Sequence, residues 1–427
     1  MSYETICAPA TAPGGAIGII RISGPQSLEI LSHIFTHDLT NAQPNTIHYG
    51  HIKDGEEIID EVLVSIFRTP HSYTGEDSAE ISCHGSRYIL NKVLELLIQH
   101  GGRMAQPGEF TQRAYLNGKM DLSQAEAVAD LIASSNKATH QMAISQLRGG
   151  ISTQLGKLRE QLLKLTSLLE LELDFSDHED LEFADRTQLL QLAQAIDTHI
   201  SRLAQSFEVG NALKNGIPVA IIGAPNVGKS TLLNALVGEE RAIVSDIQGT
   251  TRDAIEDTIQ LGGITFRFID TAGIRHTSDT IENLGIERSK AAAQRARIIL
   301  LMTEPGVPYP AIETRDDQTV IRIENKTEAF QAKYGIGLDA LKQQLIAAVP
   351  QTSDADVIIT NARHYDALVR AHAAIQRVIE GLEKQMSGDL LSEDLRQAID
   401  ILAEITGGQI TPNEVLENIF KNFCVGK

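Results

Sequence analysis

The chain of 427 residues contains no tryptophan, and aromatic residues make up only 4% of it. A surface that binds nucleic acid mainly by base stacking needs such side chains, so their scarcity argues against a stacking platform. Positive charge is also scarce, because 37 Lys and Arg face 56 Asp and Glu and leave a formal charge of −19. Nucleic acid is therefore repelled at long range, and any RNA contact must be local or supplied by a partner.

Cysteines are few, and long apolar runs are missing. Cys7, Cys83 and Cys424 are too scattered for a disulfide framework or a zinc site, so the thiols are expected to be reduced. No apolar run approaches the roughly 20 residues that a membrane-spanning helix needs, and the first residues lack the basic and apolar parts of a secretory signal. We therefore expect a cytoplasmic protein without a membrane partner.

The pattern of apolar residues divides the chain into three parts, as its length leads one to expect at roughly 150 residues per domain. Residues 1–118 combine short β-like runs with one helix and predict an α+β domain. Helical periodicity occupies residues 119–214 and 351–427, whereas residues 215–350 alternate strands and helices as a parallel α/β domain does. Neither helical segment has an obvious partner for its apolar stripe. We expect the two to form one discontinuous helical domain, with the α/β domain inserted between them.

A phosphate-binding loop follows the first strand of the inserted domain. Residues 223–230, Gly-Ala-Pro-Asn-Val-Gly-Lys-Ser, match G-x-x-x-x-G-K-[ST] between a predicted strand and a predicted helix. In such a loop the backbone N–H groups surround the β-phosphate, the lysine reaches the β- and γ-phosphates, and the serine hydroxyl ligates Mg²⁺. The sequence therefore predicts a nucleoside triphosphate site. The residues expected at the nucleotide are Asn226, Val227, Gly228, Lys229, Ser230 and Thr231.

Two downstream motifs favour GTP as that nucleotide. The first is Gly249-Thr250-Thr251-Arg252-Asp253, and the second, after the predicted strand 264–269, is Asp270-Thr271-Ala272-Gly273. In this order and spacing, Thr251 would contact Mg²⁺ and the γ-phosphate, and Asp270 would hold the water ligands of the metal. The N–H group of Gly273 would meet the γ-phosphate.

The residue that orients the attacking water is not found where Ras-type GTPases carry glutamine. Ile274 stands there, and its side chain can neither donate nor accept a hydrogen bond. Asp279 and Glu282 are the nearby acidic candidates. Either can equally be an exposed carboxylate at the start of a helix.

The end of the domain that would recognise the base is irregular. A guanine pocket usually carries Asn-Lys-x-Asp, but Glu328 replaces the aspartate after Asn325 and Lys326. The expected Ser-Ala-Lys is reduced to Gln-Ala-Lys at residues 331–333, which leaves no room for the strand between the two motifs. We expect an edge strand to be missing and the base pocket to be looser than usual.

The sequence closely resembles the MnmE (TrmE) family of GTPases that modify tRNA uridines, and the match extends over nearly the whole chain. The most specific run is Pro107 to Leu122, Pro-Gly-Glu-Phe-Thr-Gln-Arg-Ala-Tyr-Leu-Asn-Gly-Lys-Met-Asp-Leu, followed by Gln124-Ala125-Glu126-Ala127. Tyr73 to Asp77 and the C-terminal Phe423-Cys424-Val425-Gly426-Lys427 are also typical.

The resemblance implies a fold and an activity. It implies an N-terminal domain that binds a tetrahydrofolate derivative (5-formyl- or 5,10-methylene-tetrahydrofolate) and forms a homodimer, a helical domain, and an inserted G domain. It further implies that GTP hydrolysis gates the addition of an aminomethyl or carboxymethylaminomethyl group to C5 of the wobble uridine of certain tRNAs. A partner subunit of the MnmG type would carry FAD in a heterotetramer and supply most of the tRNA affinity.

The resemblance also assigns roles to residues. Potassium would be bound by Asn226, Ser245, Ile247 and Thr250, and would sit where other GTPases place an arginine finger. Asp246 and Gln248 would also belong to the GTP-binding site. Glu282 would orient the water. Arg21, Glu80, Lys119 and Lys427 would bind the folate. Cys424 would be functional, although it can equally be an ordinary thiol near the chain end.

Two other functions fit parts of the sequence. A nucleotide-gated scaffold would use the G domain as a slow switch and leave all chemistry to the partner. A ribosome-assembly GTPase with helical appendages would explain the G domain, but it would leave the folate-like N-terminal domain and the Cys-Val-Gly-Lys end without a role.

Overall fold

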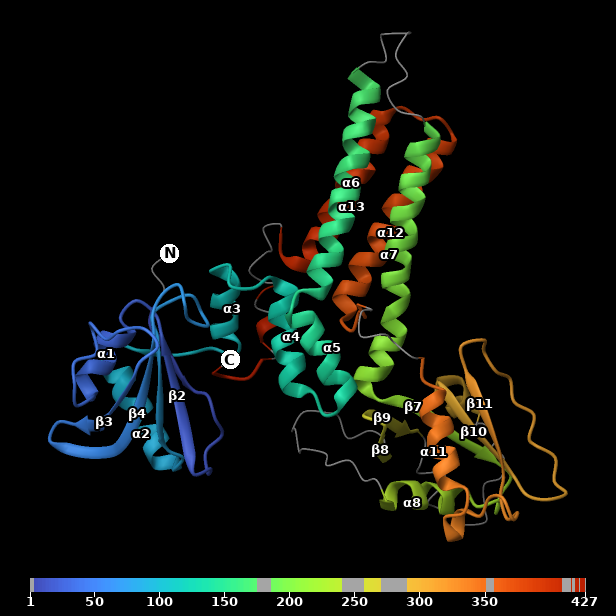
Figure 1. The fold of residues 1–427 in the computed structure, drawn as a ribbon, viewed down its shortest axis with the longest axis horizontal. Helices are drawn as coiled ribbons and strands as arrows, with labels where there is room; N and C mark the ends of the chain where they lie inside the picture. The colour runs from blue at the N-terminus through green and yellow to red at the C-terminus, as the bar shows by residue number, and fades with distance from the viewer. Residues whose placement is uncertain are drawn as a thin grey trace. The chain divides into compact units, whose positions relative to one another are not determined.

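The computed structural model describes residues 4–174, 186–239, 257–269, 290–350, 357–408, 416, 419–421 and 423–426. The chain forms two compact units. Figure 1 shows its helices and strands, coloured along the sequence. The first contains Met1–Ala133, Gln146–Glu160 and Arg396–Lys427, and the second contains Ser134–Ser145 and Gln161–Leu395. The multidomain α/β and α architecture expected from the sequence is confirmed.

The first unit is built on a six-stranded sheet with the order β3-β4-β5-β2-β1-β6. Apolar residues at alternate positions of the strands give the sheet one buried face. Helices α1 and α2 cover that face through Leu28, Leu31, Val93 and Leu97. The strands are β1 (Ile6–Pro9), β2 (Ile17–Ser23), β3 (Ile47–Asp54), β4 (Glu57–Phe67), β5 (Ser78–His84) and β6 (Arg103–Met104), and the helices are α1 (Ser27–Ile34) and α2 (Arg87–Gln99).

Further helices follow this sheet along the chain. They are α3 (Glu109–Leu116), α4 (Leu122–Ala133), α5 (Lys137–Leu147) and α6 (Gly150–Asp174). In α6, leucines at steps of three and four form a buried seam, which the periodicity of the sequence predicts. The members of the seam are Leu155, Leu158, Leu162, Leu165 and Leu169.

The second unit contains a five-stranded sheet with the order β11-β10-β7-β9-β8. All neighbouring pairs are parallel except β8 with β9, which form an antiparallel hairpin. Helix α8 follows β7 directly, and η1 and α11 follow β11. The elements are β7 (Ile217–Gly223), α8 (Lys229–Glu239), β8 (Asp257–Leu261), β9 (Ile264–Phe268), β10 (Ile298–Thr303), β11 (Thr319–Glu324), η1 (Ala332–Tyr334) and α11 (Leu338–Ala347).

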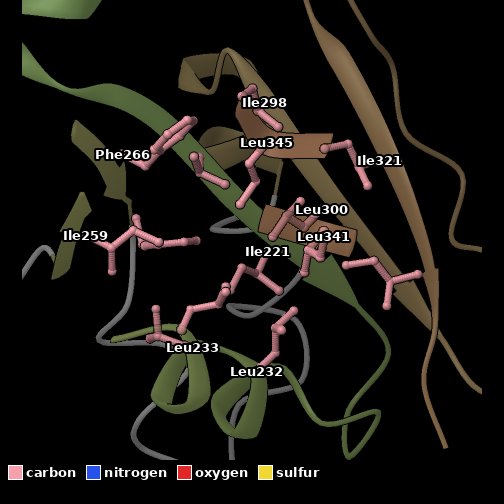
Figure 2. Close-up of a cluster of buried hydrophobic side chains, with 14 of the residues drawn as sticks. Ile221, Leu232, Leu233, Ile259, Phe266, Ile298, Leu300, Ile321, Leu341 and Leu345 are labelled. Carbon is pink, nitrogen blue, oxygen red and sulfur yellow. The ribbon is translucent and has the colours of Figure 1, made fainter. Parts of the chain in front are cut away.

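Both faces of this sheet are buried, so its central strands are apolar at successive positions. On one face, Ile221 and Leu300 pack with Leu232 of α8 and Leu345 of α11 (Figure 2). On the other face, Ile222 and Leu301 pack against Ala292, Ala293 and Ala296. The short loop of residues 224–228 joins the carboxyl end of β7 to the amino end of α8.

Helices α7 (Arg186–Asn215) and α12 (Ala362–Glu383) pack against each other in the second unit. Phe207 stacks on Tyr365 with ring centroids 4.6 Å apart, and Asp197 contacts His372, so the helices run antiparallel. Helix α12 belongs to the second predicted helical segment, and the antiparallel pairing of α6 with α7 stays a prediction. His372 of α12 is 39% exposed, and its Nδ1 lies 2.6 Å from Asp197 Oδ1.

Helix α13 (Gly388–Thr406) is the last long helix of the described chain. Among the described residues, no helix is long and apolar enough to cross a membrane.

Candidate functional site

The loop between β7 and α8 has the backbone conformation that a phosphate-binding turn requires. Asn226 and Gly228 have φ angles of 62° and 100°. At Gly228 a Cβ atom would lie 2.4 Å from Nδ2 of Asn325, so glycine is required both by conformation and by space. The loop ends at the first turn of α8, where Lys229, Ser230 and Thr231 lie.

The Lys229 side chain is folded back over this loop. Its Nζ donates hydrogen bonds to the carbonyl oxygens of Gly223 and Ala224, both at 2.8 Å. Burial lowers the pKa of the Lys229 ammonium, because the surroundings solvate its charge less well than water does. An anion placed in the turn would find this cation and the amino end of α8 beside it.

Asn325 joins the base-recognition segment to the phosphate-binding loop. The residue directly follows β11 and is 5% exposed. Its Nδ2 donates to the Val227 carbonyl at 2.8 Å, and its Oδ1 accepts from the Ala332 N–H at 3.1 Å. Asn325 therefore contacts both the phosphate-binding loop and the Gln-Ala-Lys motif, which includes Ala332 and begins only a few residues after Asn325 in the sequence.

The neighbouring residues of the base-recognition segment are more exposed. Lys326 has a φ angle of 64°, its Nζ lies 3.4 Å from the Asn226 carbonyl oxygen, and it forms an ion pair with Glu304. Glu328, the residue that replaces aspartate, is exposed. Among the described residues, β11 is an edge strand and is followed by η1 rather than by another strand.

Many of the predicted nucleotide-site residues lie outside the described residues. These are Ser245, Asp246, Ile247, Gln248, Gly249, Thr250, Thr251, Asp270, Thr271, Ala272, Gly273 and Glu282, together with the alternative Asp279. The described chain resumes at β8 and ends at Ile269 between these two groups, so the β8–β9 hairpin connects them in chain order.

In the first unit, the structure brings Arg21 and Glu80 together as neighbours on β2 and β5. Arg21 Nε and Nη2 both donate to Glu80 Oε1, at 3.0 and 2.7 Å. The guanidinium also lies 5.6 Å from the ring centroids of Tyr73 and Phe110. The partly exposed Arg21 and Glu80 offer donors and acceptors to a ligand, whereas the Phe110 ring is fully buried against the guanidinium.

The C-terminal tail packs against this charged pair. Arg21 Nη1 donates to the Gly426 carbonyl at 3.1 Å. Gly426 has a φ angle of 93°, and a Cβ atom there would lie 2.2 Å from the Pro9 carbonyl oxygen, so a larger residue would push the tail away. Sequence reasoning missed this contact, because residues 405 positions apart carry no local signal of it. Lys427 lies outside the described residues.

The other predicted residues of the first unit lie near the same segments. Lys119 Nζ donates to the Pro70 carbonyl at 2.7 Å, so it contacts the loop that carries Tyr73. Cys424 is exposed, and its carbonyl accepts from the Gly108 N–H at 3.3 Å.

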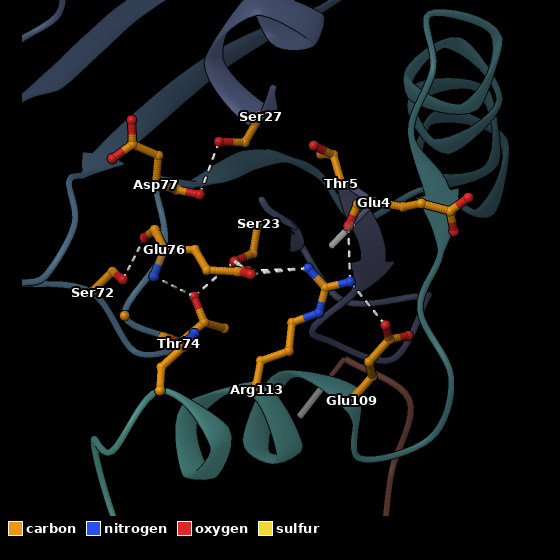
Figure 3. A network of polar contacts seen from close by, with 12 residues as sticks. Glu4, Thr5, Ser23, Ser27, Ser72, Thr74, Glu76, Asp77, Glu109 and Arg113 are labelled. Carbon is orange, nitrogen blue, oxygen red and sulfur yellow. Dashed lines mark hydrogen bonds and ion pairs between the residues drawn. The ribbon is translucent and has the colours of Figure 1, made fainter. Parts of the chain in front are cut away.

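A buried charge network adjoins this region and was not predicted from the sequence (Figure 3). The Arg113 side chain is 3% exposed and bonds to Glu76, to Glu109 and to the Glu4 carbonyl. Burial acts to raise the pKa of Glu109, but hydrogen bonds from Arg103, the Gln106 N–H and Arg113 outweigh it, so that the pKa is lowered. The available signal was the Glu-x-x-x-Arg spacing of α3, which puts both side chains on one helix face.

Two family models match the chain. The MnmE helical domain matches residues 122–424, and the GTP-binding protein TrmE N-terminus matches residues 5–119. Among curated relatives, tRNA modification GTPases MnmE of Bacteroides fragilis and Bacteroides thetaiotaomicron are 55% and 54% identical to this chain. Each alignment covers 100% of this chain and 100% of the relative. The MnmE of Porphyromonas gingivalis is 50% identical, with 99% of this chain and 98% of the relative covered.

The alignment with the Bacteroides fragilis relative is longer than this chain. It spans 467 positions and covers 100% of both proteins, whereas this chain has 427 residues, which leaves 40 positions (467 against 427) without a counterpart here. The loss of a strand near the base-recognition end stays a prediction, because the aligned gap is not placed along the chain.

Proposed function

The chain belongs to the MnmE family of tRNA modification GTPases, and we propose that it is the GTP-hydrolysing subunit of a complex that modifies C5 of the wobble uridine in tRNA. The observation that carries the proposal is the hydrogen bond from Asn325 Nδ2 to the Val227 carbonyl, in the same loop over which Lys229 is folded. It ties a base-recognition segment to a phosphate-binding loop in the arrangement that a P-loop GTPase needs.

The hydrolysis would proceed by attack of water on the γ-phosphorus. A bond forms from the water oxygen to phosphorus, the bond to the oxygen that bridges the β- and γ-phosphates breaks, and GDP and phosphate result. Lys229 would leave its two carbonyl acceptors and neutralise charge on the β- and γ-phosphates. Its lowered pKa agrees with a cation that gains from an anionic partner. Ser230 would ligate Mg²⁺ together with Thr251.

We further propose that potassium activates this hydrolysis. Asn226 lies at an exposed turn with its backbone in the left-handed region, which agrees with a side chain free to ligate a cation beside the phosphates. Ser245, Ile247 and Thr250 would complete the site. The cation would supply positive charge where charge develops during the reaction. Glu282 would orient the attacking water, since Ile274 cannot.

The first unit would bind the folate derivative. Arg21 and Glu80 supply a donor and an acceptor on one sheet face, and Tyr73 and Phe110 flank the guanidinium. Lys119 would attract the acidic tail of the ligand, and Lys427, which follows Gly426 in the sequence, would assist it. Cys424 is exposed and close in sequence to that anchor, which supports a functional thiol.

Partners would supply what the chain lacks. The formal charge of −19 disfavours strong tRNA binding by this chain alone, so an FAD-binding subunit of the MnmG type would carry most of the tRNA affinity. A homodimer and a cytoplasmic location belong to the same proposal. The scaffold and the ribosome-assembly GTPase are not favoured, because the curated relatives are tRNA modification GTPases and the TrmE N-terminal model matches residues 5–119.

The test of the proposed chemistry is GTP hydrolysis by the purified full chain and by Lys229→Ala. We expect the wild type to release phosphate and the variant to lose most of the activity, because it lacks the cation beside the phosphates. Lys214→Ala, at the exposed end of α7, is the matched control and should hydrolyse GTP at the wild-type rate. Equal hydrolysis by all three proteins would contradict the site assignment.

A further inference from the structure

Glu304 is held at the edge of the second unit's sheet where β10 ends. It directly follows that strand and begins a tight turn, in which the Val307 N–H donates to the Glu304 carbonyl at 3.0 Å. Pro305 and Gly306 occupy the middle of the turn, and Gly306 has a φ angle of 79°, which is typical of a type II turn. The local sequence therefore fixes the position of Glu304.

Lys326 lies at the same edge, shortly after the end of β11. Strands β10 and β11 are parallel neighbours, and the Asn325 N–H continues their pairing by donating to the Thr303 carbonyl at 2.8 Å. The backbone turns at Lys326, where the φ angle is 64°. Because β7 pairs with the other side of β10, this edge also carries the start of the phosphate-binding loop. In open sheets of mostly parallel strands, ligands bind outside the carboxyl ends of the strands.

The Lys326 side chain is held by two acceptors. Its Nζ donates to the Asn226 carbonyl of the phosphate-binding loop at 3.4 Å and forms an ion pair with the Glu304 carboxylate. The methylene groups in between connect the end of β11 to the loop, and the side chain stays 55% exposed. An apolar stem that is held at both ends offers its surface to a flat ring.

The ion pair also gives the two lysines near the loop different charges to offer. Lys229 bonds to neutral carbonyl oxygens, so its positive charge remains available to phosphate groups. The charge of Lys326 is matched by that of Glu304, so this pair as a whole is neutral. Phosphate groups therefore gain little from Lys326, whereas the face of a base can pack on its stem.

We propose that Glu304 is a positioning residue for the nucleotide base, which acts by holding the Lys326 stem where a purine ring stacks on it. The inference rests on the proposed function, since it needs a nucleotide in the phosphate-binding loop. It names a source of base affinity that does not depend on Glu328. Because every purine has a flat face, this contact strengthens binding without selecting guanine.

The direction of one effect separates this role from simple repulsion. A carboxylate that only lay near the ligand would repel its phosphates, so removing the charge would tighten nucleotide binding. A carboxylate that holds Lys326 keeps the stem in place, so removing the charge weakens nucleotide binding. Glu304→Gln makes this comparison, because it removes the charge and keeps the shape of the side chain.

The test measures binding of GDP, IDP and ADP to the full chain by titration calorimetry, for the wild type, Glu304→Gln, Lys326→Met and the double variant. Methionine keeps an unbranched apolar stem but lacks the ammonium that bonds Glu304. Glu324→Gln is the matched control, because Glu324 is an exposed carboxylate at the end of the neighbouring strand β11. Inorganic pyrophosphate is the probe without a base, and the thermal midpoint of each protein reports its stability.

We expect Glu304→Gln to weaken binding of all three nucleotides by roughly 2- to 5-fold, the scale of a partly exposed ion pair. Lys326→Met should weaken binding at least as much. The double variant should bind no more weakly than Lys326→Met, because Glu304 then has nothing left to hold. Pyrophosphate binding and the thermal midpoint should stay near those of the wild type, and Glu324→Gln should bind nucleotide no more weakly than the wild type.

Unchanged or tighter nucleotide binding in Glu304→Gln would overturn the inference, as would losses that add together in the double variant. A loss confined to GDP would also overturn it, since Glu304 would then read guanine directly. So would an equal loss for pyrophosphate, which would mean that the ion pair supports only the phosphate-binding loop. A wild-type chain that does not bind GDP would instead refute the proposed function, so the two failures are distinguishable.

Discussion

Asn325 bonds through its side-chain amide to the carbonyl of Val227, 2.8 Å away and 98 residues earlier in the chain. The contact is buried, and the same amide accepts from the N–H of Ala332. Asn325, in the base-recognition segment, therefore holds the phosphate-binding loop by a hydrogen bond. Glu328 is exposed, and the hydrogen bonds of the described residues that hold the loop in this way do not include it.

This division predicts strong phosphate binding and weak selection of guanine. A glutamate in place of aspartate misplaces the carboxylate that would accept from two guanine donors, and each buried donor left unpaired costs about 1 to 3 kcal/mol. Titration of the G-domain site in the full chain with GTP, ITP, XTP and ATP should give modest affinity for GTP and reduced selectivity. A preference for GTP over ATP of roughly a thousandfold or more would show that a hydrogen-bonding pocket for guanine is intact.

Hydrolysis should depend on potassium. Turnover is compared in KCl and NaCl at equal ionic strength, so that screening is the same in both. The expected stimulation by K⁺ can reach the scale of an arginine finger, roughly 10³-fold, because the cation would supply the same charge. Asn226→Ala should lose most of it. Equal rates in the two salts would count against a potassium site.

Glu282→Ala should lower kcat and leave the affinity for GTP nearly unchanged. A residue that orients the water stabilises the transition state and contributes little to binding of the ground state. Asp279→Ala is the matched control, because it removes a carboxylate from the same segment. The assignment fails if Glu282→Ala changes affinity strongly while turnover stays intact, or if Asp279→Ala alone slows hydrolysis.

The three thiols should differ sharply in reactivity. Burial raises the pKa of Cys7 and of Cys83 to about 11, whereas Cys424 is exposed. Since the thiolate is the nucleophile, a thiol with a raised pKa is almost entirely protonated at pH 8, with roughly one molecule in a thousand ionised. Iodoacetamide followed by peptide mass analysis should label Cys424 first. Equal labelling of Cys7 in the folded protein would contradict the burial described here.

Local patterns predicted most of the fold of each unit. The strand expected over residues 264–269 is β9, and the strand and helix expected on either side of the phosphate-binding loop are β7 and α8, because apolar spacing reports which residues are buried. The phosphate-binding loop was predicted from its sequence motif. The motif can be recognised locally because the turn needs glycine where the φ angle is positive, as it is at Gly228.

Contacts between distant segments could not be predicted in this way. The apolar stripes lead one to expect that the two helical segments pack together, but only the folded structure shows that α7 contacts α12, because several apolar stripes fit one another equally well. The bonds from Arg21 to Gly426 and from Asn136 to Thr265 join residues far apart in the chain. Their polar side chains carry no periodic signal, so their pairing emerges only once the units are folded.

The central claim is that this chain acts in modification of the wobble uridine, and the most direct test is mass analysis of nucleosides in tRNA from cells that lack it. The account predicts loss of the aminomethyl or carboxymethylaminomethyl uridine. It also predicts full restoration by the wild-type chain and none by Lys229→Ala. A nucleoside profile that is unchanged in the deletion strain would contradict the account.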